Sequence, residues 1–121
     1  MDSQDAFHKT LDTVQNDSQL WEEVGASVID ALKGIFDPEI SINIYDLGLI
    51  YDLKINSYGN LYVLMTFTSV WCPFADELLK QVKTLTLEAH EKINKVEVVT
   101  TMVPQWGKDR VAEEYQILLN F

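Results

Sequence analysis

Residues 61–103 contain a strand, a helix and a second strand in succession, and this order restricts the fold more than any other feature of the sequence. The segments 61–68 and 95–103 are rich in β-branched, aromatic and apolar residues, which is typical of strands. Apolar residues between them recur at helical spacing. A strand, a crossover helix and a returning strand in one sheet form a right-handed unit with parallel strands. The sequence therefore predicts a helix from Pro73 to about Lys92 that packs on a sheet with two parallel strands.

An apolar stripe across residues 21–36 predicts an earlier helix. Asp17 or Ser18 is available as its N-cap. This helix is expected to end near Asp37, because Pro38 disfavours helical geometry in the residue before it.

The remaining elements complete a small sheet. Apolar and polar residues alternate over 49–55, which predicts a strand with one buried face, and the turn residues 57–60 close a hairpin onto 61–68. Because 61–68 is apolar on both faces, it is expected to be a central strand. A short helix is expected over 108–114, and 115–121 is expected as a strand or an extended tail. The predicted fold is α/β (α+β): a two-layer sandwich whose mixed sheet of three or four strands carries helices on one face.

The length of 121 residues, 47% of them hydrophobic, fits a single domain, predicted over 18–121 after a polar N-terminal arm or short helix over 1–17. No transmembrane segment or secretory signal is recognisable, so a cytoplasmic protein is expected, and a single cysteine agrees with a reducing compartment. The formal net charge of −10 repels phosphate groups, so neither nucleic acid nor an anionic membrane is expected as a partner.

The only cysteine, Cys72, lies at the junction between the predicted central strand and the helix. Pro73 suits the first helical position, so Cys72 is expected as the N-cap, where free backbone N–H groups and the helix dipole favour the thiolate. Asp76 and Glu77 in the first turn oppose this effect. The alternative is a small buried apolar side chain, which describes most free cysteines. Position alone leaves both interpretations open.

Three carboxylates, Asp37, Glu39 and Asp46, lie in the loop before the first strand. Carboxylates brought together can bind a metal or act as acid and base. The simpler alternative is that Asp37 and Asp46 support turns and Glu39 is solvated, because Asp in a turn commonly bonds its own backbone. Trp71 and Trp106 each lie close to a proline in a loop, and the sequence leaves open whether they pack in the core or form a partner surface.

Enzymatic use of Cys72 lacks the expected partners. A cysteine hydrolase needs a base, yet His90 lies 18 residues along the same predicted helix, roughly 27 Å away at ~1.5 Å per residue. Structural zinc needs about four ligands, which one cysteine and two distant histidines cannot supply. A lone thiolate can still bind metal when a second chain supplies ligands, through a homodimer or a client protein. That pattern suits transient transfer better than storage.

Several motifs in a fixed order resemble the SufT/PaaD-like family of iron-sulfur cluster assembly factors, over about residues 20–121. The motifs are Ala31-Leu32-Lys33, Asp37-Pro38-Glu39, the run from Asn43 to Tyr51, Met65-Thr66-Phe67-Thr68 with Cys72-Pro73, and Pro104-Gln105-Trp106. The order over a hundred residues makes the resemblance specific.

The resemblance implies an iron-sulfur assembly-type domain that is not an enzyme and helps to mature cluster-containing proteins, as family members do in SUF-type pathways. Cys72 would contact the metal, the cluster or the client, Asp37, Glu39 and Asp46 would form an acidic group near it, and Thr68 would shape the loop. Trp71 stands where many members have a small residue, and it would shield the sulfur or dock a partner.

The implied ligand is a transient iron-sulfur cluster or iron, with no stably bound cofactor, and the implied partners are the assembly machinery and client apo-proteins. Three alternatives remain at this stage. They are an accessory protein of a phenylacetate-type oxygenase system, a thiol oxidoreductase or transferase with Cys72 as nucleophile, and an interaction module in which Cys72 only packs.

Overall fold

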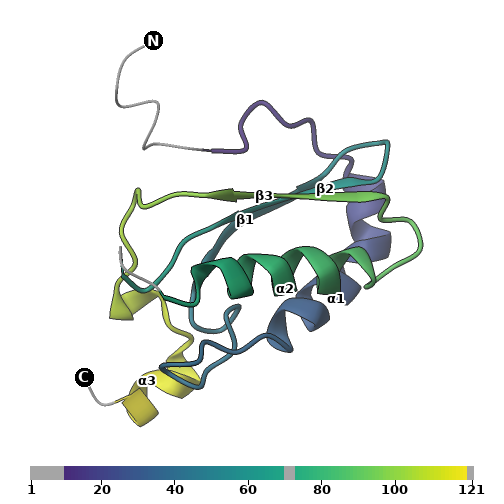
Figure 1. Ribbon diagram of the computed structural model, residues 1–121. Helices are drawn as coiled ribbons and strands as arrows, with labels where there is room; N and C mark the ends of the chain where they lie inside the picture. The colour runs from purple at the N-terminus through teal and green to yellow at the C-terminus, as the bar shows by residue number, and fades with distance from the viewer. Residues whose placement is uncertain (1–9, 70–72, 120–121) are drawn as a thin grey trace.

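The computed structural model describes residues 10–69 and 73–119, which form a three-stranded sheet with helices α1 and α2 packed on one face (Figure 1). This confirms the predicted two-layer α/β sandwich with a small mixed sheet. In chain order the elements are α1 (Ser18–Lys33), β1 (Ile50–Ile55), β2 (Asn60–Met65), α2 (Ala75–Leu87), β3 (Lys95–Thr100), the 3-10 helix η2 (Lys108–Arg110) and α3 (Glu113–Leu119).

The sheet has the order β1-β2-β3, so β2 is central as predicted. β1 pairs with β2 in antiparallel orientation through a tight hairpin, in which Gly59 has a φ of 81° and the Asn56 side chain accepts the Asn60 N–H. β2 and β3 are parallel, with the register running from Asn60 opposite Lys95 to Met65 opposite Thr100. The predicted crossover is therefore confirmed, although β3 ends at Thr100 rather than at residue 103.

Helix α1 begins where the sequence predicts, since the Asp17 carboxylate caps it by accepting the Leu20 N–H at 3.0 Å. It ends at Lys33, however, and not near Asp37. The helical stripe is interrupted because Ile35, fully buried, pairs through its carbonyl with the Ile44 N–H at 2.8 Å. Packing of the following loop into the core thus overrides the local periodicity.

Helix α2 is shorter than predicted at both ends, covering Ala75–Leu87 instead of 73–92. Its N-cap residue is Phe74, whose side chain makes no capping hydrogen bond, so the expectation that Cys72 is the N-cap and Pro73 the first helical residue is wrong. After α2 the chain turns and brings Ile93 into the core, where it is 5% exposed. Burial of that side chain requires the turn, which explains the early end of the helix.

The C-terminal segment also differs from the expectation of a strand or extended tail over 115–121. Residues 113–119 form the helix α3 after the 3-10 helix η2. Glu113 and Glu114 lie in its first turn, where their negative charges interact favourably with the positive end of the helix dipole. The Gln116 side chain also donates to the Val111 carbonyl at 2.7 Å. These local effects favour a helix, although the apolar residues of this segment are typical of a strand.

The described part of the predicted N-terminal arm, residues 10–17, is not helical and lies along β1. Leu11 is 2% exposed, and its carbonyl accepts a hydrogen bond from the Lys54 ammonium. Asn16 and Asp17 bond both backbone groups of Ile55, at 2.9 and 2.7 Å. The segment therefore covers this end of the outer edge of β1. Within the described ranges, no helix is long and apolar enough to cross a membrane.

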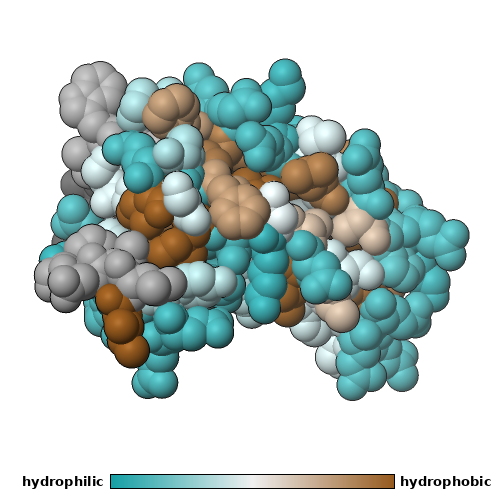
Figure 2. Space-filling model, turned by 90° about the horizontal axis from the view of Figure 1, so that it is seen from below, coloured by the Kyte–Doolittle hydropathy of each residue, from teal (hydrophilic) through white to brown (hydrophobic). Residues whose placement is uncertain are grey.

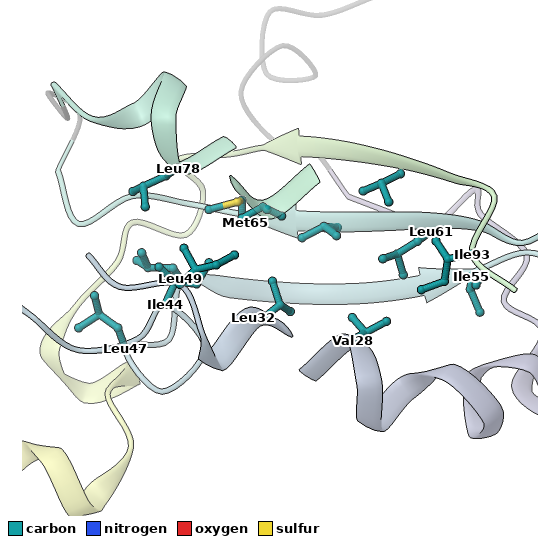
Figure 3. Packing of buried hydrophobic residues seen from close by; sticks show 14 of the residues in the cluster. Val28, Leu32, Ile44, Leu47, Leu49, Ile55, Leu61, Met65, Leu78 and Ile93 are labelled. Atoms are coloured by element: carbon teal, nitrogen blue, oxygen red, sulfur yellow. The ribbon is translucent and has the colours of Figure 1, made fainter. Parts of the chain in front are cut away.

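The hydrophobic core fills the space between the sheet and the two helices (Figure 3). Val28 and Leu32 of α1 lie below the sheet residues Ile55 and Leu61 in this view, and all four are fully buried. The core continues to the other end of the sheet through a second group, which comprises Ile44, Leu47, Leu49, Met65 and Leu78. This second group supports the loops described next.

Candidate functional site

Three loops meet at the carboxyl ends of β2 and β3. Because these strands are parallel, the loops that follow them, 66–74 and 101–107, leave the sheet at the same end (Figure 1). The loop 34–49 enters β1 there, and the Leu49 carbonyl accepts the Thr66 N–H at 2.9 Å. In α/β sheets, ligands bind outside the carboxyl ends of parallel strands. This end of the sheet is therefore the candidate site, and the 66–74 loop is the one that contains Cys72.

The structure describes both ends of the Cys72 loop. Cys72 itself, with Trp71, lies outside the described residues. At one end, Thr66 is fully buried and its hydroxyl contacts the Met102 sulfur at 3.6 Å, which joins the loop to the segment after β3. Thr68 is half-buried and Pro73 is exposed. The loop thus starts at a buried residue, Thr66, and one of its described residues before α2, Pro73, lies at the surface. The roles assigned to Cys72 and Thr68 stay predictions.

Asp37 is a structural residue of the turn that follows α1. Its side chain is 3% exposed, and one carboxylate oxygen accepts the N–H groups of Glu39 and Ile40 at 2.8 and 3.1 Å. Its backbone also bonds Ile42 and Ser41, and Ser41 has a φ of 66°. The contacts of Asp37 therefore match the alternative in which its carboxylate supports a turn.

Asp46 is likewise bonded within its own turn. Its carboxylate accepts from the side-chain N–H of Asn43 at 2.7 Å, and the side-chain amide oxygen of Asn43 accepts the Asp46 backbone N–H at 2.9 Å. Glu39 is exposed, as the solvated alternative expects. In the part of the chain that the structure describes, no group of three or more His, Cys, Asp or Glu side chains could hold a metal ion. An acidic group beside Cys72 stays a prediction.

Trp106 fastens the loop after β3 to the loop before β1. Its indole Nε1 donates to the Leu47 carbonyl at 2.7 Å, and its ring packs against the core while remaining half-buried. A second tie follows, since the Ala112 N–H donates to the Asp46 carbonyl at 2.8 Å. Trp106 therefore stabilises the framework of the site, and a role of its exposed part in a partner surface stays a prediction.

Gly48 allows the loop before β1 to lie close to the backbone of η2. It has a φ of 83°, and a Cβ atom at this position would lie 2.3 Å from the Arg110 carbonyl oxygen. Only glycine fits such a contact and such a backbone conformation without strain. Sequence reasoning missed this role of Gly48, and it also missed the reciprocal bond between Asn43 and Asp46. The spacing of Asn and Asp three residues apart before a glycine is the signal that could have revealed this bond.

Tyr51 and Arg110 form a further contact that sequence reasoning missed. The Tyr51 hydroxyl donates to the Pro104 carbonyl at 2.6 Å, and the Arg110 guanidinium lies 4.5 Å from the centre of the Tyr51 ring. Burial raises the pKa of Tyr51 above 10.0, and the positive charge of Arg110 partly offsets this shift. The contact joins β1 to the loop after β3.

Large apolar side chains are exposed near these loops. Phe74 before α2 is 42% exposed, Val103 after β3 is 38% exposed, and Ile117 in α3 is 84% exposed. Figure 2 shows hydrophobic atoms gathered at the left of the molecule, on the side where Figure 1 places the β2–α2 loop and α3. Exposed apolar surface of this kind is typical of protein contact regions.

The profile of a family described as iron-sulfur cluster assembly protein matches residues 25–99. This range covers more than half of the chain, and it includes the loop with Cys72 and the turns of Asp37 and Asp46. The chain belongs to this iron-sulfur cluster assembly family. The resemblance to SufT-like proteins predicted from the motifs is thereby confirmed, although the profile ends before Trp106.

Three curated relatives in this SufT-like family have similar names. The Fe-S protein maturation auxiliary factor of Porphyromonas gingivalis is 36% identical over 94 residues, which cover 78% of this chain and 89% of that protein. YitW of Bacillus subtilis, with the same description, is 31% identical over 98 residues, covering 81% and 95%. SufT of Staphylococcus aureus, also so described, is 38% identical over 85 residues, covering 70% and 96%.

Solved structures agree with the fold. A domain of unknown function from Bacillus anthracis has a TM-score of 0.79 at 28% identity and covers 87% of this chain and 99% of its own. A conserved hypothetical protein from Thermotoga maritima has a TM-score of 0.69 at 33% identity and covers 79% and 93%. The α/β sandwich of this iron-sulfur assembly family member is thus shared with its relatives over nearly their whole length.

Proposed function

We propose that this protein is a non-enzymatic auxiliary factor that helps to deliver iron-sulfur clusters to client apo-proteins. The observation that carries the proposal is that three relatives, 31–38% identical over 70–81% of this chain, are named Fe-S protein maturation auxiliary factors. The proposal assigns this chain to the same class of role and, within it, to a SUF-type pathway.

Cys72 is the group proposed to contact the cluster iron or the client. It lies in the loop at the carboxyl ends of the parallel strands, between Thr68 and Pro73. The carboxylates of Asp37 and Asp46 are already bonded within their turns. The thiol therefore acts with ligands from the cargo or from a second chain, and the bond to iron is transient. Such a site passes a cluster on and does not retain it.

The framework of the site supports this use. The Trp106–Leu47 bond and the close approach of Gly48 to Arg110 join the loop before β1 to the segment after β3, at the end of the sheet where β2 ends. The exposed apolar side chains of Phe74 and Val103 lie in the segments next to the loop with Cys72, where they offer a contact area for a client. In this proposal the joined loops orient a client for contact with the thiol.

The experiment measures the activity of cluster-dependent dehydratases in cells that lack this gene. Plasmids supply the wild type, Cys72→Ser, or the control Asp76→Asn, which alters an exposed residue in the first turn of α2. We expect the deletion to lower dehydratase activity, and the wild type and Asp76→Asn to restore it at equal protein levels. Cys72→Ser is expected to fail. Restoration by Cys72→Ser would remove Cys72 from the mechanism, and unchanged activity in the deletion strain would reject the maturation role.

A further inference from the structure

A groove with a volume of about 490 Å³ lies between α2 and β3 at the edge of the sheet, away from the loops of the candidate site. Its apolar lining comes from Leu79 of α2 and from Val96 and Val98 of β3. Lysines also line it, from α2 and from the first residue of β3: Lys80, Lys83 and Lys95. All three lysines are exposed.

β3 is an edge strand, and within residues 10–69 and 73–119 it pairs with β2 alone. The opposite edge of the sheet differs, because the segment before α1 bonds the backbone of Ile55 in β1. An uncovered edge presents N–H and C=O groups that can pair with an additional strand. The β3 edge is thus built to accept an extended segment beside it, next to the apolar and lysine side chains of the groove.

The charge of the groove contrasts with that of the chain. The chain has 19 acidic residues against nine Lys and Arg, and three of those nine basic residues line this one groove. A single acid, Glu97, also lines the groove. Asp76 and Glu77 lie about one turn of α2 before Lys80. The three lysines form no ion pair within the described ranges. Their charges are available to a partner.

We propose that this groove binds an extended acidic segment of a partner protein, which adds to the sheet as a strand beside β3. Backbone hydrogen bonds to the edge would give affinity, and acidic side chains at alternate positions, on the face toward α2, would meet Lys80 and Lys83. The proposal rests on the proposed function only in taking the partner to be a client or a component of the assembly machinery.

A second copy of this chain fits the groove less well. Symmetric pairing of two β3 strands would bring Lys80 and Lys83 of both copies to one interface, where like charges oppose association. Charge complementarity therefore favours an acidic segment of another protein.

The test uses the full chain and a fluorescent eight-residue peptide of alternating Glu and Val, with binding followed by fluorescence anisotropy at low salt. We expect Lys80→Gln and Lys83→Gln each to weaken binding by about threefold, and the double variant by about tenfold. Lys33→Gln, which alters an exposed lysine at the end of α1, is expected to leave the affinity unchanged. An equal loss with Lys33→Gln would reduce the binding to general charge attraction and would overturn the proposal.

A second peptide separates strand addition from surface attraction. It carries N-methyl groups on alternate residues, which remove the N–H donors that face one edge, and we expect its affinity to fall by at least about tenfold. Equal affinity of the two peptides, or no binding by either at about 1 mM, would overturn the proposal. A spontaneous dimer that the double lysine variant strengthens would assign the edge to a second copy and would equally overturn it.

The outcome is independent of the thiol. Cys72→Ser is expected to keep the full peptide affinity, because the groove lies between α2 and β3. Failure of peptide binding with successful rescue of dehydratases by the wild type would reject only the groove, whereas peptide binding without any maturation role would reject only the proposed function.

Discussion

The indole Nε1 of Trp106 donates a hydrogen bond of 2.7 Å to the carbonyl oxygen of Leu47, and this bond joins two loops that are 59 residues apart in sequence. One loop precedes β1 and the other follows β3. The bond therefore joins the two loops at the candidate-site end of the sheet, beyond the paired strands. The stability of this end therefore depends on a side chain outside the regular elements.

Removal of the Trp106 contact has two separable effects. Trp106→Phe keeps an aromatic ring but loses the donor, and we expect it to lower the free energy of unfolding by about 1 kcal/mol. Trp106→Ala also removes the packing against the core and is expected to cost about 3 kcal/mol. Urea unfolding of the two variants measures both. Equal values for Phe and Ala would show that the hydrogen bond, and not the ring, carries the effect.

Gly48→Ala is expected to lower the free energy of unfolding by at least about 2 kcal/mol, because the residue has a φ of 83° and the new Cβ would lie 2.3 Å from the Arg110 carbonyl oxygen. Gly34→Ala serves as the matched control. Gly34 has a φ of −88°, and a Cβ atom there would lie 3.3 Å from the Ala31 carbonyl oxygen. The loss of stability in Gly34→Ala should therefore be much smaller. Thermal unfolding of both variants decides, and similar losses would contradict the role given to Gly48.

The turn role of Asp37 predicts a difference between two substitutions. Asp37→Asn keeps an oxygen that can accept the Glu39 and Ile40 N–H groups, so we expect near-native stability and full rescue of dehydratase activity. Asp37→Ala leaves those donors without their acceptor and is expected to cost about 2 kcal/mol. A loss of rescue with a stable Asp37→Asn would show instead that the negative charge serves the site.

The raised pKa of Tyr51 predicts a pH effect on stability. Because burial disfavours the phenolate, the folded protein holds this proton above pH 10.0, where the unfolded chain releases it. The contribution is therefore fully present below pH 10.0 and is lost as the pH rises through the folded pKa. Tyr51→Phe should remove one phenol that ionises above 10.0 in an ultraviolet titration, and it should flatten the decline of stability in that range. Removal of a phenol that ionises at or below 10.0 would contradict this assignment.

Elements with a strong local or pairwise pattern were predictable from the sequence. The Asp17 cap, the hairpin at Gly59 and the central position of β2 follow from capping, turn and composition rules, and the structure confirms them. The parallel pairing of β2 with β3 follows from the handedness of a strand-helix-strand crossover. These features depend on residues that are close together in sequence or on a single topological rule.

The element ends and the framework of the site were less predictable, because they depend on contacts between distant segments. Helix α1 ends at Lys33 since Ile35 must pair with Ile44, and α2 ends early so that Ile93 can enter the core. Local rules overlooked in the C-terminal segment account for α3, where Glu113 lies in the first turn. The bond from Trp106 to Leu47 has no local signal at all.

The cluster content of a client tests the central claim most directly. A dehydratase is purified from cells that carry the wild-type gene, Cys72→Ser or no gene, and its iron and acid-labile sulfide are measured per polypeptide. The account predicts a full complement with the wild type and a similar deficit with Cys72→Ser and with the deletion, at equal dehydratase levels. An equal cluster content in all three strains would contradict it.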